Sequence, residues 1–397
     1  MFKVAMWLVV LFSLSACQQR TLPANIDDLV TALKSISGQT SCSSLGIFVE
    51  YGFDNALVND CEITANKVSL TITPENTPIN DSAWYAFKIS SARVQNTEIE
   101  INYQAGSHRY APKVSDNLKS WRELEYTSTK AQLTFTVETS QQARYIAGQE
   151  IVDNHAYQQW IEQYRHREDI VVASLGKSIQ GREIIALEIA NANNNANEKE
   201  WLIVLGRMHP PEVTGALALF PFVDVLLSEQ GQAFRERFNI LVVPNLNPDG
   251  VANGHWRHNA DGVDLNRDWK SFKQVETRLV RNKLNQITNR GDKIAFAVDF
   301  HSTHRDVFYT LPSDYGIKPP LLVEQWLAQL AQEVPQFTVN NKPGTSNIGV
   351  FKQFIADTYK VHAITYEMGD NTNRQVIEDV AKAASKTLMD NLLKIQK

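Results

Sequence analysis

The sequence predicts an α/β protein with a mixed, mainly parallel central sheet and helices on both faces, preceded by a small antiparallel β-sandwich. Between residues 44 and 137, short runs alternate apolar and polar residues, with turn formers but no helical stretches between them. Such runs are typical of an antiparallel sandwich. Later in the chain, helical segments alternate with dense apolar strands, which are typical of strands buried on both faces. The length of 397 residues allows each domain a core of its own.

The N-terminus differs in composition from the rest of the chain. It reads MFKVAMWLVVLFSLSACQQR, with one early lysine, an apolar run and then small residues. The apolar run is too short to span a bilayer, so the pattern predicts an export signal over residues 1–17. The segment LSAC, which ends at Cys17, resembles the lipobox of bacterial lipoproteins. This resemblance implies cleavage before Cys17 and acylation of its sulfur. The alternative is an ordinary cleaved signal with a chance cysteine.

The lipobox resemblance also implies a location. An acylated protein would be held at the periplasmic face of the bacterial envelope by its lipid anchor alone. Gln18, where an aspartate would favour the inner membrane, makes the outer membrane the expected site.

The β-sandwich is expected over residues 40–145. Five runs carry its two-residue period: LGIFVEYGF (45–53), KVSLTITP (67–74), AWYAFKISS (83–91), TEIEINYQ (97–104) and AQLTFTVE (131–138). Cys42 and Cys61 both fall in this segment. An exported protein meets an oxidising compartment, which permits a disulfide between them. Two buried free thiols are the alternative.

The second domain is expected over residues 150–395. Its apolar strands are EIIALEIA (183–190), EWLIVLG (200–206), NILVVPNLNP (239–248), KIAFAVDFH (293–301) and VHAITYEMG (361–369). In sheets of this kind the ligand crevice lies beyond the carboxyl ends of the strands. Polar residues in that position are therefore candidates for chemistry.

Three of these strands end in residues that can bind or serve a metal ion. His209 and Glu212 follow the second strand, His301 ends the fourth, and Glu367 lies near the end of the fifth. Two imidazoles and one carboxylate leave a zinc ion an open position for water, which is the arrangement of a catalytic site. Glu367 is then the candidate base for that water. His304 is a second candidate beside His301, but it falls in the loop after the strand, so we expect it to line the pocket.

The segment NPDGVANGHWRHNADGVDLNRDW (247–269) adds Arg257, Asn266 and Arg267. A guanidinium fork binds a carboxylate through two parallel hydrogen bonds. Zinc, arginines and an asparagine together predict a site for the free carboxylate of a peptide. The alternative for each arginine is an ordinary surface ion pair.

Several motifs in order resemble the zinc metallocarboxypeptidases of the carboxypeptidase A kind. They are HPPE (209–212), NPDGV (247–251), WR (256–257), GVDLNRDW (262–269), FHS (300–302) and YEMGDN (366–371). The resemblance covers roughly residues 150 to 395 and implies the zinc carboxypeptidase fold. It implies one Zn²⁺ per chain, held by His209, Glu212 and His301, with Glu367 as general base.

The same resemblance implies roles for four further residues. Arg257 matches the arginine that polarises the scissile carbonyl, and Asn266 and Arg267 match the pair that holds the C-terminal carboxylate. Asp264 matches the carboxylate that orients the first zinc histidine. One element of the family is missing: the stretch VNNKPGTSNIGVF (339–351) has no tyrosine at the place of the family's mobile tyrosine. Candidates elsewhere in the chain are Tyr309, Tyr315 and Tyr366.

A β-sandwich before the catalytic domain resembles the cytosolic carboxypeptidase subgroup, although an export signal departs from that subgroup. The expected activity is therefore a metallocarboxypeptidase that acts on peptides with a free C-terminal carboxylate. Two alternatives stay open: a zinc amidohydrolase that acts on murein peptides or N-acyl amino acids, and a catalytically dead binding protein. A net charge of −5 and a pI near 6.0 give no basic surface that would indicate nucleic acid. The sequence does not specify an oligomeric state.

Overall fold

The computed structural model describes residues 40–190 and 199–395. Within it, Ser41–Lys397 forms one compact unit. The predicted export signal and the lipobox with Cys17 lie outside the described residues. Among those residues, no single helix has the length and hydropathy of a transmembrane span, although the bent pair Val213–Leu227 and Glu229–Arg237 meets that test by composition.

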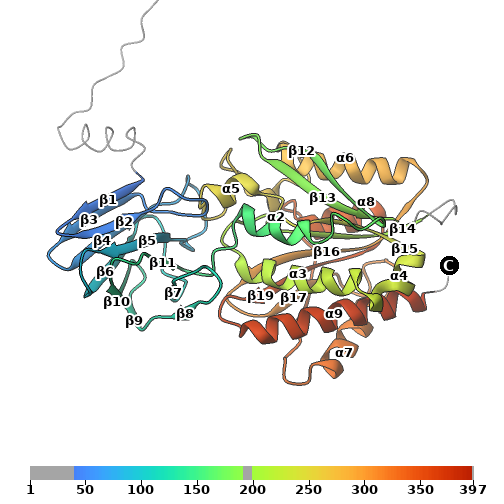
Figure 1. Cartoon of the computed structure of the whole chain (residues 1–397). Helices are drawn as coiled ribbons and strands as arrows, with labels where there is room; N and C mark the ends of the chain where they lie inside the picture. The colour runs from blue at the N-terminus through green and yellow to red at the C-terminus, as the bar shows by residue number, and fades with distance from the viewer. Residues whose placement is uncertain (1–39, 191–198, 396–397) are drawn as a thin grey trace, which may run out of the picture. The chain divides into compact units, whose positions relative to one another are not determined.

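The first domain is a sandwich of two sheets (Figure 1). In spatial order, the first sheet contains β1 (Ser41–Ser44), β2 (Ile47–Glu50), β5 (Ala86–Ser91), β11 (Arg144–Ala147), β7 (Lys113–Ser115) and β8 (Arg122–Glu123). The second contains β3 (Asp60–Thr64), β4 (Lys67–Ile72), β6 (Gln95–Tyr103), β10 (Gln132–Thr139) and β9 (Tyr126–Ser128). Neighbouring strands are antiparallel, except that β4 and β6 are parallel.

The two-residue period of these strands builds the sandwich core. In β4, Val68 and Leu70 are fully buried while the residues between them are partly exposed, and β10 repeats this alternation with Phe135 and Val137. Side chains from both sheets pack into one apolar cluster. Alternation therefore places one face of each sheet in the core and leaves the other toward solvent.

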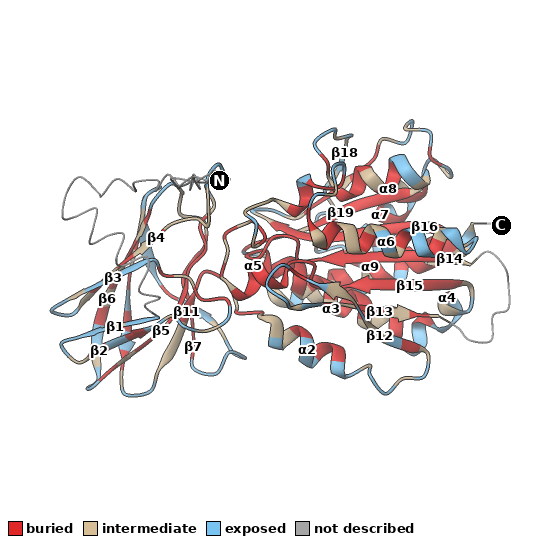
Figure 2. Cartoon of the chain, turned by 90° about the horizontal axis from the view of Figure 1, so that it is seen from above, coloured by how far each residue is buried: buried red, intermediate tan, exposed pale blue. Residues whose placement is uncertain are grey.

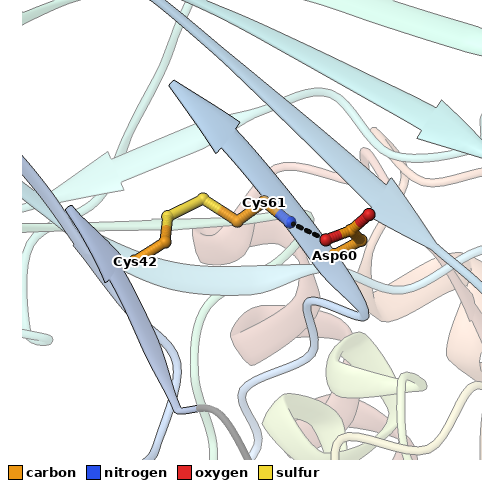
Figure 3. The surroundings of a disulfide bond; sticks show 3 residues. All are labelled: Cys42, Asp60 and Cys61. Atoms are coloured by element: carbon orange, nitrogen blue, oxygen red, sulfur yellow. Dashed lines mark hydrogen bonds between the residues drawn. A yellow bond between two sulfur atoms is a disulfide. The ribbon is translucent and has the colours of Figure 1, made fainter. Parts of the chain in front are cut away.

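A disulfide joins Cys42 of β1 to Cys61 of β3 (Figure 3). These strands are the first strands of the two sheets, so the bond connects one sheet of the sandwich to the other. The sequence left a disulfide and two free thiols open, and the structure contains the disulfide. Because it closes a loop across a separation of 19 residues, it restricts the unfolded chain, an effect on the order of 3 kcal/mol.

The second domain contains a mixed sheet of eight strands. In spatial order they are β12 (Ile170–Lys177), β13 (Glu183–Ile189), β15 (Phe238–Val243), β14 (Glu200–Gly206), β16 (Lys293–Thr303), β19 (His362–Gly369), β17 (Val307–Thr310) and β18 (Asn341–Pro343). The four central strands, β15, β14, β16 and β19, are mutually parallel. They are buried along nearly their whole length (Figure 2). The predicted fold class is thus confirmed.

Helices cover both faces of this sheet. They are α2 (Asn154–Glu162), α3 (Val213–Leu227), α4 (Gln232–Arg237), α5 (Pro248–Ala252), α6 (Val275–Asn289), α7 (Leu322–Glu333), α8 (Phe351–Tyr359) and α9 (Arg374–Lys394), with short 3-10 turns η1 (Glu229–Gly231) and η2 (Leu265–Arg267). Alternate residues of β14 face the two layers: Leu202 and Val204 pack with α3, α7 and α9, whereas Ile203 and Leu205 pack with α6 and α8.

Candidate metal centre and substrate pocket

Strand register brings the predicted site residues to one edge of the central sheet. Gly206, the last residue of β14, pairs with Phe300 of β16. His301 of β16 pairs in turn with Glu367 of β19. Because these strands are parallel, the side chains that follow or end them meet at the same edge.

The turn that carries His209 and Glu212 is fixed by its neighbours. Arg207 has a left-handed backbone with φ of 54°, and its buried guanidinium donates to the carbonyl of Pro210 at 2.7 Å and to Tyr157 Oη at 3.2 Å. Glu212 immediately precedes α3 in the N-cap position, but its side chain makes no capping hydrogen bond. The carboxylate is therefore available for the histidines.

Glycine at position 215 allows the start of α3 to approach β16. A Cβ atom there would lie 2.6 Å from the carbonyl oxygen of His301, which is backbone that cannot move aside. The close contact is also secured by a hydrogen bond of 2.8 Å from the Gly215 N–H to Ser302 Oγ. A side chain at this position would push the helix that begins after Glu212 away from the strand that carries His301.

The carboxylate of Glu212 lies between two imidazoles. Its Oε1 is 2.8 Å from His209 Nδ1 and its Oε2 is 2.6 Å from His301 Nδ1. The far nitrogen of each ring meets another carboxylate: His209 Nε2 is 2.8 Å from Asp264 Oδ1, and His301 Nε2 is 2.8 Å from Asp299 Oδ2. Carboxylates on the far nitrogens fix the orientation of metal-binding histidines.

The three residues fit a zinc ion. One ligand atom from each of His209, Glu212 and His301 lies within 4.8 Å of the other two, and all three residues are buried. This donor set leaves a fourth position of a tetrahedral ion open. His304, the alternative to His301, is exposed and stands outside this cluster, where it lines the adjoining pocket.

The surroundings of the carboxyl groups shift their pKa values in opposite directions. Burial opposes ionisation of Glu212, but His209 and His301 outweigh it and hold the pKa of Glu212 well below its usual value. Burial also opposes ionisation of Asp264, and the pKa of that group is nevertheless lowered by His209 and Arg257.

Glu367 stands in contrast to these two acids. Burial, followed by the negative charge of Glu212, raises the pKa of Glu367 to about 7. Its Oε2 atom is buried and has no hydrogen-bond partner within the part of the chain that the structure describes. A carboxyl group with a pKa near neutrality can both accept and donate a proton.

A pocket of about 600 Å³ opens over the metal cluster. Arg257, Asn266 and Arg267 all line it, as the sequence predicts. Arg257 Nε donates to Asp264 Oδ2 at 2.7 Å. The side chain of Arg267 is 42% exposed, and its Nη1 donates to the carbonyl of Asn266 at 2.8 Å.

The amide of Asn266 already has partners inside the protein. Its Oδ1 accepts from the backbone N–H of Phe351 at 2.9 Å, and its Nδ2 lies 3.2 Å from His301 Nε2. The hydrogen bond from Phe351 fixes the side chain at the wall of the pocket. Of the three candidate tyrosines, Tyr309 lines the pocket, whereas Tyr315 bonds Asp357 and Tyr366 is fully buried.

Three residues of the site escaped the sequence reasoning. Asp299 lies two positions before His301 on the same strand, and this spacing placed it on the same face as the histidine. Lys352 stands in the largely apolar run VFKQFIA, and a single charge in such a run indicates a buried cation. Arg109 comes from the β-sandwich and lines the pocket; it donates to Asp370. No sequence pattern indicates that contact.

Lys352 forms part of the pocket wall and is 5% exposed. Its Nζ donates to the carbonyls of Thr310 and Gly344, each at 2.6 Å. Burial lowers the pKa of Lys352 to about 8, so the amine still carries its charge at neutral pH. An ammonium has three donors, and two of them are used here.

Two family models match the chain. The model for zinc carboxypeptidases matches residues 157–377, and the model for the cytosolic carboxypeptidase N-terminal domain matches residues 50–148. An uncharacterized protein of Zymomonas mobilis is 25% identical over 340 residues, which are 81% of this chain and 87% of that protein. Cytosolic carboxypeptidase 2 of Xenopus tropicalis is 30% identical over 210 residues, which are 48% of this chain but 22% of that protein.

Solved structures share the fold. A metallo-carboxypeptidase from Burkholderia cenocepacia matches with a TM-score of 0.74 and 16% identity, over 87% of this chain and 99% of its own. A metallo-carboxypeptidase from Pseudomonas aeruginosa, solved in complex with (2-guanidinoethylmercapto)succinic acid, matches with a TM-score of 0.69 and 20% identity, over 87% and 99%. Each match extends over 87% of this chain, which is more than the second domain alone contains.

The arrangement of the cluster makes a prediction about zinc content. The substitution Glu212→Gln removes the negative charge between the two imidazoles, so the purified variant is expected to contain far less zinc than the wild type. The measurement is elemental analysis by mass spectrometry of protein dialysed against a weak chelator. His304→Gln is the matched control, because this histidine lines the same pocket outside the cluster, and it should keep its zinc. Equal zinc in Glu212→Gln and the wild type would rule out this ligand set.

Proposed function

Because the chain belongs to the zinc carboxypeptidase family, we propose that it hydrolyses the C-terminal peptide bond of peptides or proteins. One observation carries this proposal: the metal cluster, a carboxyl group with a pKa near neutrality and a half-exposed guanidinium line a single pocket. That pocket offers a hydrolytic centre and an anchor for a free carboxylate at the same place. We propose one Zn²⁺ per chain.

His209, Glu212 and His301 would hold the zinc ion. A zinc ion bound there supplies Lewis acidity, which polarises a carbonyl group and lowers the pKa of a coordinated water. Asp264 and Asp299 keep the two imidazoles oriented through their far nitrogens.

Glu367 moves the proton in this mechanism. Its Oε2, which has no partner among the described residues, receives a proton from the attacking water. The same oxygen then returns that proton to the nitrogen of the leaving amine. Burial and the charge of Glu212 raise the pKa of Glu367 in the cluster without its metal, and a bound cation would favour the carboxylate form that accepts the first proton.

Arg257 serves the carbonyl oxygen of the scissile bond. Its Nε is held by Asp264, which orients the guanidinium and leaves its terminal nitrogens for the substrate. Negative charge develops on that oxygen only as the bond is attacked, so a fixed cationic donor stabilises the transition state more than the bound substrate.

Arg267 and Asn266 serve the terminal carboxylate. The side chain of Arg267 is the most exposed of the three pocket arginines, with 42% accessible against 18% for Arg257 and 18% for Arg109. The side chain of Asn266 is held by the backbone N–H of Phe351, so its amide N–H₂ group stands at a fixed place in the pocket lining. A carboxylate held by both would place the last peptide bond over the metal cluster.

Lys352 favours an acidic side chain at the C-terminus of the substrate. The ammonium is buried in the pocket wall, and its two protein acceptors are neutral carbonyls. A buried cation without an anionic partner is costly, and a substrate carboxylate would supply that partner.

Two alternatives to this activity use the same scaffold. An amidohydrolase acting on murein peptides or N-acyl amino acids would keep the same ligands and base but use the arginines differently. A location at the bacterial envelope, which we propose from the N-terminal sequence alone, would bring murein peptides within reach. A catalytically dead binding protein is the third possibility, and the presence of all the residues of the proposed mechanism argues against it.

The role of Glu367 can be tested by Glu367→Gln. Zinc content and thermal stability should match the wild type, because the carboxylate is outside the proposed ligand set. Activity on a free-acid peptide should fall by about 10²–10⁴-fold, the usual contribution of a general base. The measurement is kcat/KM together with zinc analysis. Near-normal turnover by the variant would exclude Glu367 as the base.

The direction of attack can be tested with matched peptides that end in a free acid or in an amide. The wild type should strongly prefer the acid, because an amide cannot pair with a guanidinium fork. Arg267→Ala should lose most of its activity on the acid and so narrow this preference. Liquid chromatography with mass spectrometry identifies the products, and murein tripeptide is included as a further substrate. Equal cleavage of the acid and the amide by the wild type would indicate an endopeptidase or amidase instead.

The contribution of Lys352 can be tested by Lys352→Met with peptides that end in glutamate or leucine. A hydrogen bond to a charged group contributes about 1.5–3 kcal/mol, so kcat/KM for the glutamate peptide should fall roughly 10- to 100-fold. Activity on the leucine peptide should stay the same or rise. The control is Lys342→Met, since Lys342 also lines the pocket but is exposed. An equal loss on both peptides would mean that Lys352 has no part in side-chain preference.

A further inference from the structure

A glutamate of the β-sandwich binds the backbone that carries Arg257. Glu75 lies in the loop after β4, and its side chain is 7% exposed. Its Oε1 accepts from the N–H groups of Arg257 at 2.9 Å and of His258 at 2.5 Å, and its Oε2 accepts from the N–H of Trp256 at 2.9 Å. Three consecutive backbone donors thus converge on one carboxylate, and hydrogen bonds to an ionised acceptor are the stronger kind.

The segment that carries Arg257 is also anchored to the sandwich on both sides of this arginine. The indole of Trp256 packs into the sandwich core, where a Cβ atom on Gly106 would lie 1.8 Å from its ring. Asn76, next to Glu75, donates to the carbonyl of Gly262 at 3.1 Å and lies 2.8 Å from His258 Nδ1. The sandwich therefore contacts this segment through backbone and side chains at several points.

The segment has little regular structure of its own. We call residues 253–263 the arginine loop. They connect α5 to Asp264, the N-cap residue of η2. It contains turns and bends but no strand or helix. Without Glu75, three partly buried N–H groups of this loop would lose their acceptor, and such groups cost free energy when unpaired. The loop would then be expected to change its conformation around Arg257.

Arg257 is thus held from two domains. Its backbone is fixed by Glu75 of the sandwich, and its Nε is fixed by Asp264, whose other oxygen bonds His209. A guanidinium stabilises developing charge only if it is in place before the reaction. An error of about 1 Å in the position of a catalytic group can cost roughly 10²-fold in rate.

We infer that Glu75 is a positioning residue for Arg257, so that the β-sandwich is a working part of the active site rather than an attached module. This inference rests on the proposed function for its effect on catalysis. The effect on the arginine loop does not depend on that function. If Glu75 only stabilised the fold, its loss would lower the free energy of unfolding without a selective loss of transition-state binding.

The test is Glu75→Gln. A glutamine side chain replaces one acceptor oxygen by an N–H₂ group that faces backbone donors, so the three bonds cannot all form. We expect kcat to fall roughly 10- to 100-fold with KM changed by less than about threefold, because Arg257 acts mainly in the transition state. A phosphonate peptide that mimics the tetrahedral transition state should bind weaker by a similar factor. Zinc content should be unchanged.

Two controls separate positioning from general damage. Glu125→Gln changes an exposed glutamate of the same domain and should leave every measurement unchanged. The double variant Glu75→Gln with Arg257→Ala should be hardly slower than Arg257→Ala alone, because the arginine that Glu75 positions is gone. Losses that multiply in the double variant would overturn the inference, and so would a normal kcat in Glu75→Gln.

A further readout does not require activity. Hydrogen exchange, followed by mass spectrometry, should be faster in Glu75→Gln for peptides that cover residues 255–262, and unchanged in the central sheet. Unchanged exchange in this segment would overturn the inference even if the wild type cleaves no peptide. If Glu75→Gln does not fold, Glu75→Asp takes its place, with a smaller loss of kcat and the same non-additivity with Arg257→Ala expected.

Discussion

The structure of the site depends on one buried carboxylate, that of Glu212, placed between two imidazoles. A buried anion is tolerated only when it is paired and hydrogen-bonded. Here both oxygens face ring nitrogens, and the opposite sides of the rings face Asp264 and Asp299. The result is a buried chain of alternating acids and bases that carries an excess of carboxyl groups. A divalent cation bound at the centre would balance that excess, which is why this cluster fits a metal ion better than a simple ion-pair network.

The surrounding fold can be understood from the need to hold this carboxylate in place. Glu212 precedes α3, and Gly215 allows that helix to approach the backbone of His301. The parallel register of β14, β16 and β19 then brings His209, His301 and Glu367 to the same edge. Because Glu367 lies in the same low-dielectric region as Glu212, its pKa rises toward neutrality. The same register places Glu367 in the pocket lining beside the candidate ligands, which is the position that the proposed proton transfer requires.

The fold class and the residues at the strand ends could be predicted from the sequence, because both depend on local patterns. Apolar strands show where the sheet is buried, and polar residues directly after them fall at the ligand-binding edge. Asp299 was within reach of the same reasoning. The lone charge of Lys352 in an apolar run was visible in the sequence, but its place in the pocket wall depends on its contact with β17. Arg109 and Glu75 required knowledge of how the two domains dock. The sequence PENTP around Glu75 has the composition of a solvated turn, and its partners lie about 180 residues further along the chain.

The two domains contribute to different parts of the proposed site: one supplies the candidate metal ligands, and the other contacts the loop that carries Arg257. The three candidate ligands and the proposed base all belong to the second domain, so the candidate metal site is built by that domain alone. The backbone of Arg257 instead depends on Glu75, and the pocket wall also includes Arg109 from the sandwich. Arg109 pairs with Asp370, directly after β19, so the sandwich contacts the end of the strand that carries Glu367 as well as the arginine loop. With Glu75 in the positioning role proposed above, a change in docking would alter transition-state stabilisation before it altered the metal cluster. Among the described residues, the β-sandwich supplies none of the three candidate ligands, and Glu75 instead binds the backbone of the arginine loop.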